Sequence, residues 1–461
     1  MPSLASDLAD WSHRLRYTDL PDDVRQASKL RLLDILGLSL AGADTPLGRS
    51  TRDAAVALSP GGPCTIVGTG DRVSVTSAAL ANGTFSQALE YDDTHNESIV
   101  HMSSPSVAAS LALAETTPVT GTELLTAIAI GNEVACRVGS VGSGQFHKRG
   151  FHPTGLFGAF GAAYLASRLL GLDADATARA AGICGSFAAG ILECWVDGTD
   201  TKFLHAGWAA QSGVSSAHLA RAGATGAIQV FEGRFGFFAS HLQHPDRPPD
   251  FARLVDDLGS HWESRNASFK PFPSAHVIHP YIDAVLRLRR EHGIRAGDVE
   301  RIDCPVTQFI VGIVCEPVEE KVEPATRSHC RVSLQHTLAE ALWGGSLGKD
   351  AHADEYRLHP EVKALARRVH YHVDPTYPGP GRFKGAARIT LKDGRVVETV
   401  EEYNRGSREN PMSEDDLRAK FDENASTFLD RDARTRLAEA VASLETLPDA
   451  AVLAPLAVRG T

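Results

Sequence analysis

The chain has 461 residues and a formal net charge of −11, with 43% hydrophobic and 22% charged residues. This composition is typical of a globular protein, and the length favours two domains over a single core. The acidic balance argues against nucleic acid or an anionic membrane as a partner, because both select a basic surface. A small anionic substrate remains compatible, since a few Lys and His side chains set the local field of a pocket.

The cysteines and the N-terminal residues indicate in which cellular compartment the protein is expected. The seven cysteines are scattered and include no C-x-x-C pair, so we expect reduced thiols and neither disulfides nor a zinc site. The N-terminal segment contains acids and no apolar run, unlike a signal peptide. The most apolar stretches are interrupted before they reach the roughly 20 residues of a membrane span. We therefore expect a cytoplasmic protein without a membrane partner.

The chain begins with a long series of helical patterns. A wide apolar stripe follows Asp22 and Asp23, either of which is expected to cap a helix that ends near Gly42. Ser74 or Thr76 is expected to cap the next helix. Small residues are frequent throughout, so the helices are expected to pack closely. Further helices are predicted over residues 106–114, 122–138 and 159–170.

The pattern changes near residue 266, where short apolar runs of period two begin. Residues 387–391 and 396–400 flank an Asp393-Gly394 turn, which is a strong hairpin signal. Helical signals return at Ser413, which starts a good N-terminal signature. Further strands are predicted over residues 301–306 and 369–373, with helices near 280–292 and 333–344.

These patterns predict a mainly α protein with two domains. Residues 1–265 and 406–461 are expected to form one large, all-helical domain. Residues 266–405 are expected to form a smaller α+β lid domain inserted into it. We find no internal repeat and no low-complexity segment.

The segment Glu90–His95, followed by His101, places three acids and a histidine within six residues after an apolar helix. Acids this close repel one another and shift one another's pKa values, as in many active sites. A solvated acidic helix end explains the same pattern equally well. Asp92, Asp93, His95 and His101 also suit a metal ion, but no matching second cluster of O or N ligands stands out, so we expect no metal.

Two further clusters lie in the helical part. His152 is held between Gly150 and Pro153, directly before a Gly- and Ala-rich helix whose N-terminus favours anions. Lys202 lies between a polar turn and an apolar helix. Taken singly, a His packed in a turn and a solvated Lys are the more usual readings of these two positions.

A fourth cluster lies at the expected boundary between the domains. Lys270 is confined between Phe269 and two prolines, and His276 and His279 follow closely. Restricted freedom suits a ligand contact, and domain boundaries often carry ligand sites. An ordinary linker remains the alternative. Phosphate-binding loops, H-E-x-x-H zinc motifs and serine-hydrolase elbows are not found in the sequence.

Together, these clusters resemble the MmgE/PrpD family, which includes 2-methylcitrate dehydratase, cis-aconitate decarboxylase and iminodisuccinate epimerase. Each matching piece is short, but their number, order and spacing make the combination specific. The pieces are Leu32–Gly37, Ala81–Gly83, Tyr91–His95, Gly150–Pro153, Lys202–Gly207, Glu232–Gly236, Phe269–Pro273, Val332–Gln335 and Asn410–Ser413.

The resemblance implies a homodimer with a site between the domains, and neither a metal nor an organic cofactor. Three positions depart from the decarboxylase pattern: Glu90 replaces an Asp, Ala275 replaces a His, and His336 replaces a Tyr. His276, beside Ala275, is a candidate substrate contact, as are His279 and His336. The decarboxylase pocket would fall on Glu90, Thr94, His101, His152, Lys202 and Lys270.

We therefore expect a cofactor-independent lyase, a dehydratase or a decarboxylase, that acts on a small di- or tricarboxylic acid. His101 and His152 are the expected acid–base pair, because an imidazole exchanges protons near neutral pH. Lys202 and Lys270 would anchor carboxylates and stabilise negative charge. Glu90 or Asp93 would orient an imidazole, and Thr94 would donate a hydrogen bond to the substrate. The alternatives are an isomerase or epimerase on a similar dicarboxylate, and a catalytically silent carboxylate-binding homologue.

Overall fold

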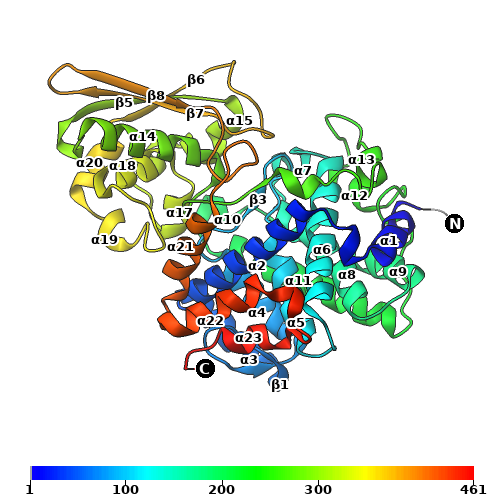
Figure 1. The fold of residues 1–461 in the computed structure, drawn as a ribbon. Helices are drawn as coiled ribbons and strands as arrows, with labels where there is room; N and C mark the ends of the chain where they lie inside the picture. The colour runs from blue at the N-terminus through cyan, green and yellow to red at the C-terminus, as the bar shows by residue number, and fades with distance from the viewer. Residues whose placement is uncertain (1–2, 461) are drawn as a thin grey trace. The chain divides into compact units, whose positions relative to one another are not determined.

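The computed structural model describes residues 3–460, which divide into two compact units. The larger unit contains residues 3–192, 201–267 and 413–460 and is almost wholly helical (Figure 1). The smaller unit contains Glu193–Asp200 and Ser268–Met412 and combines helices with a four-stranded sheet. The protein is thus mainly α-helical, as the sequence predicts. Glu193–Asp200 belongs to the smaller unit, although the sequence pattern places it in the helical part.

The larger unit contains fifteen α-helices and short strands. They are α1 (Leu4–Arg14), α2 (Asp22–Ala43), α3 (Pro46–Leu58), β1 (Pro60–Thr65), β2 (Arg72–Val73), α4 (Val75–Gln87), β3 (Thr94–His95), α5 (Ser103–Ala114), α6 (Gly121–Val141), α7 (Gln145–Lys148), α8 (Pro153–Leu169), α9 (Ala174–Cys184), α11 (Thr201–Arg221), α12 (Phe237–Leu242), α13 (Ala252–Val255), α21 (Glu414–Ala425), α22 (Arg431–Ala442) and α23 (Leu453–Leu456).

Local sequence signals explain where several helices start. Ser74 caps α4 by accepting a hydrogen bond from the backbone N–H of Ser77, and Ser413 with Asp416 forms a capping box on α21. The expected capping role of Asp22 and Asp23 is wrong, because both lie inside the first turn of α2 and no side chain caps this helix. Their charges there still favour the helix dipole.

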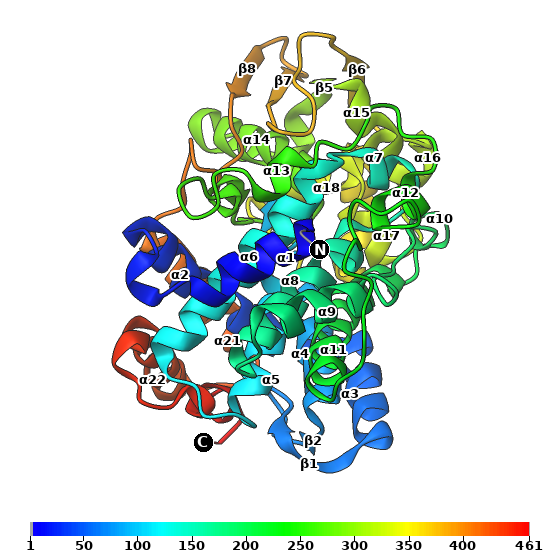
Figure 2. The ribbon, with the colours of Figure 1, turned by 90° about the vertical axis from the view of Figure 1, so that its right-hand side faces the viewer.

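Helices α4, α5, α6, α8 and α11 pack on one another in the core of the larger unit (Figure 2). Small residues allow the closest of these crossings. A Cβ on Gly207 of α11 would lie 2.1 Å from the carbonyl oxygen of Leu80 in α4, and a Cβ on Gly83 would lie 2.8 Å from Cα of Gly207. Neither backbone could stay in place with a larger residue. The crossing therefore sets the position of α11 against α4.

Helix α6 is long and apolar enough to cross a membrane, which the sequence pattern does not predict. Its most apolar window is completely buried in the structure. Packing against α5 and α8 accounts for this composition, since a helix that is apolar all round belongs in a core.

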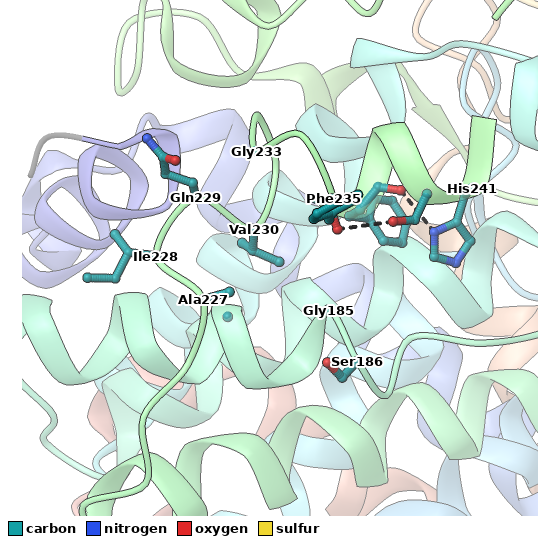
Figure 3. Close-up of a pocket in the computed structure, with 13 residues that line it drawn as sticks. Gly185, Ser186, Ala227, Ile228, Gln229, Val230, Gly233, Phe235 and His241 are labelled. Carbon is teal, nitrogen blue, oxygen red and sulfur yellow. Dashed lines mark hydrogen bonds between the residues drawn. The ribbon is translucent and has the colours of Figure 1, made fainter. Parts of the chain in front are cut away.

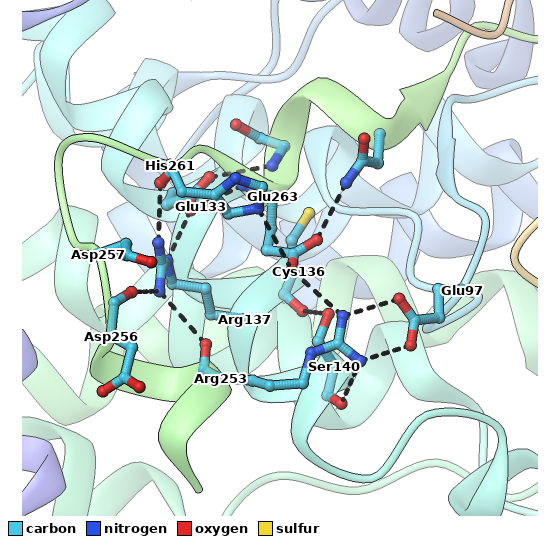
Figure 4. A network of polar contacts seen from close by, with 12 residues as sticks. Glu97, Glu133, Cys136, Arg137, Ser140, Arg253, Asp256, Asp257, His261 and Glu263 are labelled. Atoms are coloured by element: carbon cyan, nitrogen blue, oxygen red, sulfur yellow. Dashed lines mark hydrogen bonds and ion pairs between the residues drawn. The ribbon is translucent and has the colours of Figure 1, made fainter. Parts of the chain in front are cut away.

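A buried pair of charges holds residues 253–264 against α6 (Figure 4). Glu133 and Arg137, one helical turn apart, form an ion pair of 2.7 Å. Glu133 also accepts backbone N–H groups at 2.9 and 3.0 Å, from Glu263 and Ser264. Arg137 donates to the backbone carbonyl oxygens of Arg253, Asp256 and His261. Both buried charges are therefore paired and hydrogen-bonded, as burial requires.

The last segment of the chain returns to the first long helix. Helices α21 and α22, orange and red in Figure 1, pack on the blue α2. Lys420 of α21 lies 2.8 Å from the Asp34 carboxylate of α2 and donates to the carbonyl oxygen of Tyr91 at 2.9 Å. The C-terminal segment thereby supports the acidic segment that follows α4.

The smaller unit combines short helices with a mixed sheet of strand order β6-β5-β7-β8. Strand β6 is parallel to β5, with Ile302 opposite Val369, and β7 and β8 form an antiparallel hairpin with Ile389 opposite Val397. The predicted hairpin is thus confirmed, and Gly394 supplies the positive φ of its turn, +86°. Helices α14, α18 and α20 lie on one side of the sheet (Figure 1).

The unit's elements are α10 (Cys194–Asp197), α14 (His279–His292), β5 (Val299–Val306), α15 (Gln308–Ile310), α16 (Val318–Val322), α17 (Arg327–Arg331), α18 (Leu334–Gly344), α19 (Asp354–Arg357), α20 (Pro360–Ala366), β6 (Val369–Val373), β7 (Gly385–Leu391) and β8 (Val396–Glu401). The short strand β4 (Ala267–Ser268) spans the boundary of the two units.

Candidate active site

The predicted site residues fall into two groups, one in each unit, and all of them are buried. The smaller unit carries Lys270, His276, His279 and His336. The larger unit carries Glu90, Asp93, Thr94, His101, His152 and Lys202.

In the larger unit, Glu90 and Lys202 form a buried ion pair. Lys202 lies in the first turn of α11, and Glu90 lies in the loop after α4 with a φ of +57°. This left-handed conformation is uncommon for a residue other than glycine and occurs often at functional sites. The pair places an ammonium group and a carboxylate beside the imidazole of His101, whose Nε2 is 3.7 Å from Oε1 of Glu90.

His101 has acceptor oxygens on both sides of its ring. Its Nδ1 lies 3.2 Å from Oδ1 of Asp92, 3.1 Å from the carbonyl oxygen of Asp93 and 3.3 Å from Oγ1 of Thr94. Ser104 in turn holds the Asp92 carboxylate with a hydrogen bond of 2.7 Å. Both ring nitrogens of His101 therefore have oxygen atoms nearby that can accept a hydrogen bond from an N–H group.

The side chain of Asp93 turns away from His101 and toward α2 and α5. Its Oδ2 lies 3.1 Å from Nε of Arg31 and accepts a hydrogen bond from Ser103 Oγ at 2.7 Å. Burial raises the pKa of Asp93, and the positive charge of Arg31 opposes this shift. The carboxylate in contact with the His101 ring at Nδ1 is therefore that of Asp92.

His152 precedes α8 directly, and its ring lies between two other imidazoles. Its Nδ1 is 3.0 Å from Nδ1 of His205, and its ring centre is 5.8 Å from that of His101. Its Nε2 has no hydrogen-bond partner within residues 3–460. Burial, followed by the nearby His205 and Lys202, holds the pKa of His152 well below its usual range. His152 is therefore neutral at neutral pH, and its open Nε2 can accept a proton when the ring hydrogen is on Nδ1.

His205 is also neutral, because burial and the charge of Lys202 lower its pKa to about 4. One of the two facing Nδ1 atoms must carry the hydrogen, so the bond fixes opposite tautomers on His152 and His205.

Sequence reasoning missed Asp92 as a contact of His101, and His205 and Arg31 altogether. His205 had a detectable signal: it follows Lys202 by three residues and therefore shares its helix face. Arg31 had none, because it lies within the apolar stripe of α2 and far from the other site residues in sequence.

The acidic segment does not gather around a metal position. His95 points elsewhere, with Nδ1 2.7 Å from Ser98 Oγ and Nε2 3.4 Å from Oε2 of Glu263. In the part of the chain that the structure describes, the one group of three metal-binding side chains with adjacent donor atoms is Cys330, His336 and His352, in the smaller unit.

In the smaller unit, Lys270 is fully buried and its backbone neighbourhood is tightly held. The backbone N–H of Phe269 donates to the carbonyl oxygen of Gly406 at 3.0 Å. Gly406 has a φ of +93°, and a Cβ there would lie 2.1 Å from the carbonyl oxygen of Phe269. Only glycine fits this contact, which fixes the backbone next to Lys270.

The three predicted histidines of the smaller unit have different partners. His276 has its Nε2 2.9 Å from the Asn404 amide nitrogen, which donates to it. His279 donates from Nε2 to the carbonyl oxygen of Ser274 at 3.2 Å. His336 belongs to another cluster, with Nε2 3.3 Å from Oε2 of Glu340.

A hollow of about 650 Å³ also lies in the larger unit, and none of the predicted site residues line it (Figure 3). Its walls come from the end of α9 and from residues 227–241 and include the exposed side chains of Ile228 and Phe235. This hollow is therefore a feature of its own, separate from the His and Lys cluster.

Comparison with known proteins identifies the class. Residues 6–249 match the MmgE/PrpD N-terminal domain and residues 272–446 match the MmgE/PrpD C-terminal domain. The chain belongs to the MmgE/PrpD family, which confirms the resemblance seen in the sequence.

Similar proteins include a cis-aconitate decarboxylase-like protein of Aspergillus oryzae, which is 29% identical over 98% of this chain and 97% of its own. The cis-aconitate decarboxylases of Mus musculus and Homo sapiens are also 29% identical, over 99% of this chain and 93% and 95% of theirs. These likenesses support assignment of the chain to the lyases.

Proposed function

We propose that this chain is a decarboxylase or dehydratase that acts on a small di- or tricarboxylic acid. The family and the relatives named as decarboxylases support the class. One observation carries the chemistry: the neutral His152, with an open Nε2, lies next to His101, whose ring faces acceptors on both sides. A proton acceptor and a proton donor are thus adjacent, beside the ammonium group of Lys202.

Both proposed reactions require only proton transfers and no oxidant or reductant. In a decarboxylation, the bond from carbon to a carboxylate breaks, carbon dioxide leaves, and the electron pair that remains takes a proton from His101. In a dehydration, His152 removes a proton from carbon while His101 protonates the departing hydroxide, so that water leaves. Lys202 stabilises the negative charge that builds up on the carboxylate next to the reacting carbon. We therefore propose that the reaction uses no metal and no organic cofactor.

The test is turnover of a panel of di- and tricarboxylates, including cis-aconitate, followed by proton NMR in deuterated water. We expect one of two products: one that has lost carbon dioxide and carries one solvent deuterium on carbon, or one that has lost water and has gained no deuterium. In a dehydration, where His152 is the proposed base, His152→Ala should lower kcat by about 10²-fold or more, as is usual when a general base is lost. Turnover that survives in this variant would overturn the role of His152, and binding without any turnover would indicate a silent homologue.

An epimerase is the second candidate, and the two imidazoles favour it. Ring centres 5.8 Å apart and inclined by 54° offer two proton-transfer groups to one carbon, which an epimerase needs. The same NMR experiment separates the two functions. An epimerase would exchange one carbon-bound hydrogen for deuterium and lose optical rotation without releasing carbon dioxide or water.

We also propose that the chain forms a homodimer through the face around the hollow of Figure 3. Exposed apolar side chains support this, since monomers rarely expose many of them together. The indole N–H of Trp208 donates a hydrogen bond of 3.0 Å to the backbone carbonyl oxygen of Phe187. The side chain of Phe235 is 79% exposed. Light scattering should give the dimer mass for the wild type and the monomer mass for Trp208→Asp with Phe235→Asp. Wild-type chain that stays monomeric at micromolar concentration would refute the dimer.

A further inference from the structure

Three metal-binding side chains meet in the smaller unit, outside the residues used in the proposed reaction mechanism. Cys330 is the second-last residue of α17, His336 lies in the first turn of α18, and His352 precedes α19. One donor atom of each lies within 4.8 Å of the others, and all three side chains are completely buried. Three separate parts of the chain thus converge on one point.

Glu340 is hydrogen-bonded to His352 and lies close to the imidazole of His336. Its Oε2 lies 2.8 Å from Nδ1 of His352 and 3.3 Å from Nε2 of His336, and its Oε1 accepts the backbone N–H of His352 at 2.8 Å. A carboxylate behind an imidazole is the usual outer partner of a metal-bound histidine, because it fixes the tautomer and the ring direction. Each imidazole is left with its other nitrogen turned away from Glu340.

The ring nitrogens that do not face Glu340 are the observation that indicates a ligand. Nδ1 of His336 and Nε2 of His352 have no hydrogen-bond partner within residues 3–460, although both rings are fully buried. An unpaired polar atom in a protein interior is destabilising, because it has lost its hydrogen bonds to water. His352 also holds a φ of +65°, a left-handed conformation that is uncommon for histidine and often marks a functional position.

The charges of the cluster suit a divalent ion. One thiolate and one carboxylate would balance two positive charges in this interior, and a bound ion displaces the thiol proton outright.

We propose that Cys330, His336 and His352 bind a divalent transition-metal ion of the zinc class. One sulfur and two imidazole nitrogens are ligands that this class prefers, and a water molecule would complete the tetrahedron. The ion would tie α17, α18 and the segment before α19 together. Its role is structural: the proposed proton chemistry of His101 and His152 does not pass through it.

The first test is the metal content of the untagged, full-length chain, produced in zinc-supplemented medium and dialysed against a weak chelator. The wild type should retain about one ion per chain, as a three-ligand site requires. Cys330→Ala should lose it. The matched control is Cys304→Ala, another fully buried cysteine of the smaller unit that belongs to no such cluster within the described residues, and it should keep the ion. Equal metal content in all three proteins would overturn the assignment to Cys330.

A second test does not depend on any variant folding. The wild type is stripped with a strong chelator under mild conditions and titrated with Co²⁺. A thiolate-to-cobalt charge-transfer band should grow and saturate at about one equivalent. The melting temperature should fall on stripping and recover with Zn²⁺, because an ion that binds only the folded state stabilises it. A wild type that holds no metal and gives no such band on titration refutes the site.

Discussion

The bond between His152 and His205 gives two imidazoles one shared hydrogen between their Nδ1 atoms. His205 contacts Nδ1 of His152 and not the open Nε2, which is the proposed proton acceptor. We therefore describe His205 as a positioning residue. It acts in two ways: it fixes the tautomer of His152, and its proximity contributes to the low pKa of His152. Both effects keep His152 ready to accept a proton at neutral pH.

His205→Gln should therefore change the pH profile as well as the rate. We expect kcat to fall at least about 10-fold, because a misdirected imidazole transfers protons poorly. The acid limb of the profile should move to higher pH, since removal of His205 lets the pKa of His152 rise toward its ordinary value. If the His205→Gln variant loses activity but keeps the pH profile of the wild type, the role of His205 is merely structural.

Lys270 offers a second prediction at this scale. Lys270→Ala should lower kcat/KM by about 10²-fold, the cost typical of removing one charge-stabilising donor from an active site. Lys321→Ala is the matched control, because Lys321 is buried in the same unit and donates to the backbone carbonyl oxygens of Ile313 and Val332. The control should lose stability, not turnover per folded molecule. Near-normal turnover in Lys270→Ala would contradict the proposed role.

Among the elements, the crossing of α4 and α11 determines the geometry of the Glu90 and Lys202 pair. Gly207→Ala places a Cβ against the backbone of Leu80, so we expect a loss of about 1–3 kcal/mol in the free energy of unfolding. Activity should fall further than the folded fraction, because α11 carries both Lys202 and His205. Gly344→Ala is the control: a Cβ there has open space at the end of α18, and urea unfolding should show no loss.

The contact of α21 with α2 leads to a prediction that depends on pH. Burial raises the pKa of Asp34 to about 6, against the opposing charge of Lys420. Lys420→Met leaves the ionised Asp34 buried without that charge, and we expect a loss of about 3–5 kcal/mol at pH 7.

The loss in Lys420→Met should shrink toward pH 5. A raised pKa means that the folded state binds a proton more readily than the unfolded chain, so the penalty grows as pH rises and disappears as Asp34 becomes protonated. Urea unfolding at both pH values measures this change. Asp34→Asn combined with Lys420→Met removes the titrating group and should show a much smaller difference between the two pH values.

Elements with a local signal were predicted well from the sequence. Ser74 and Ser413 cap helices through their own side chains, and the Asp393-Gly394 turn closes its hairpin with the glycine conformation that the turn needs. Contacts between distant residues carry no such signal. His152 and His205, 53 residues apart, meet because glycines let α4, α8 and α11 approach, and no spacing rule indicates that.

At the scale of the whole molecule, the likeness to known decarboxylases extends over both units, so the proposed function belongs to the complete chain. The positions that we expect to depart from the decarboxylase pattern also lie in both units. Glu90 lies in the larger unit and pairs with Lys202, whereas His336 lies in the smaller unit and shares Glu340 with His352. Of the two, Glu90 is the position at which substrate preference should be explored, because it contacts Lys202.

The return of the last helices to α2 also determines when the larger unit can be completed during synthesis. While the ribosome adds the final 190 or so residues, which takes about 10–40 s, the emerging first part of the larger unit lacks α21 and α22. During that time Asp34 has no Lys420 beside it, and the apolar face of α2 stays uncovered. Both segments of the smaller unit, Glu193–Asp200 and Ser268–Met412, precede α21 and α22 in the chain and are synthesised before them. Nascent chains of this protein should therefore recruit chaperones until release, and a stop codon after residue 412 should yield an insoluble product.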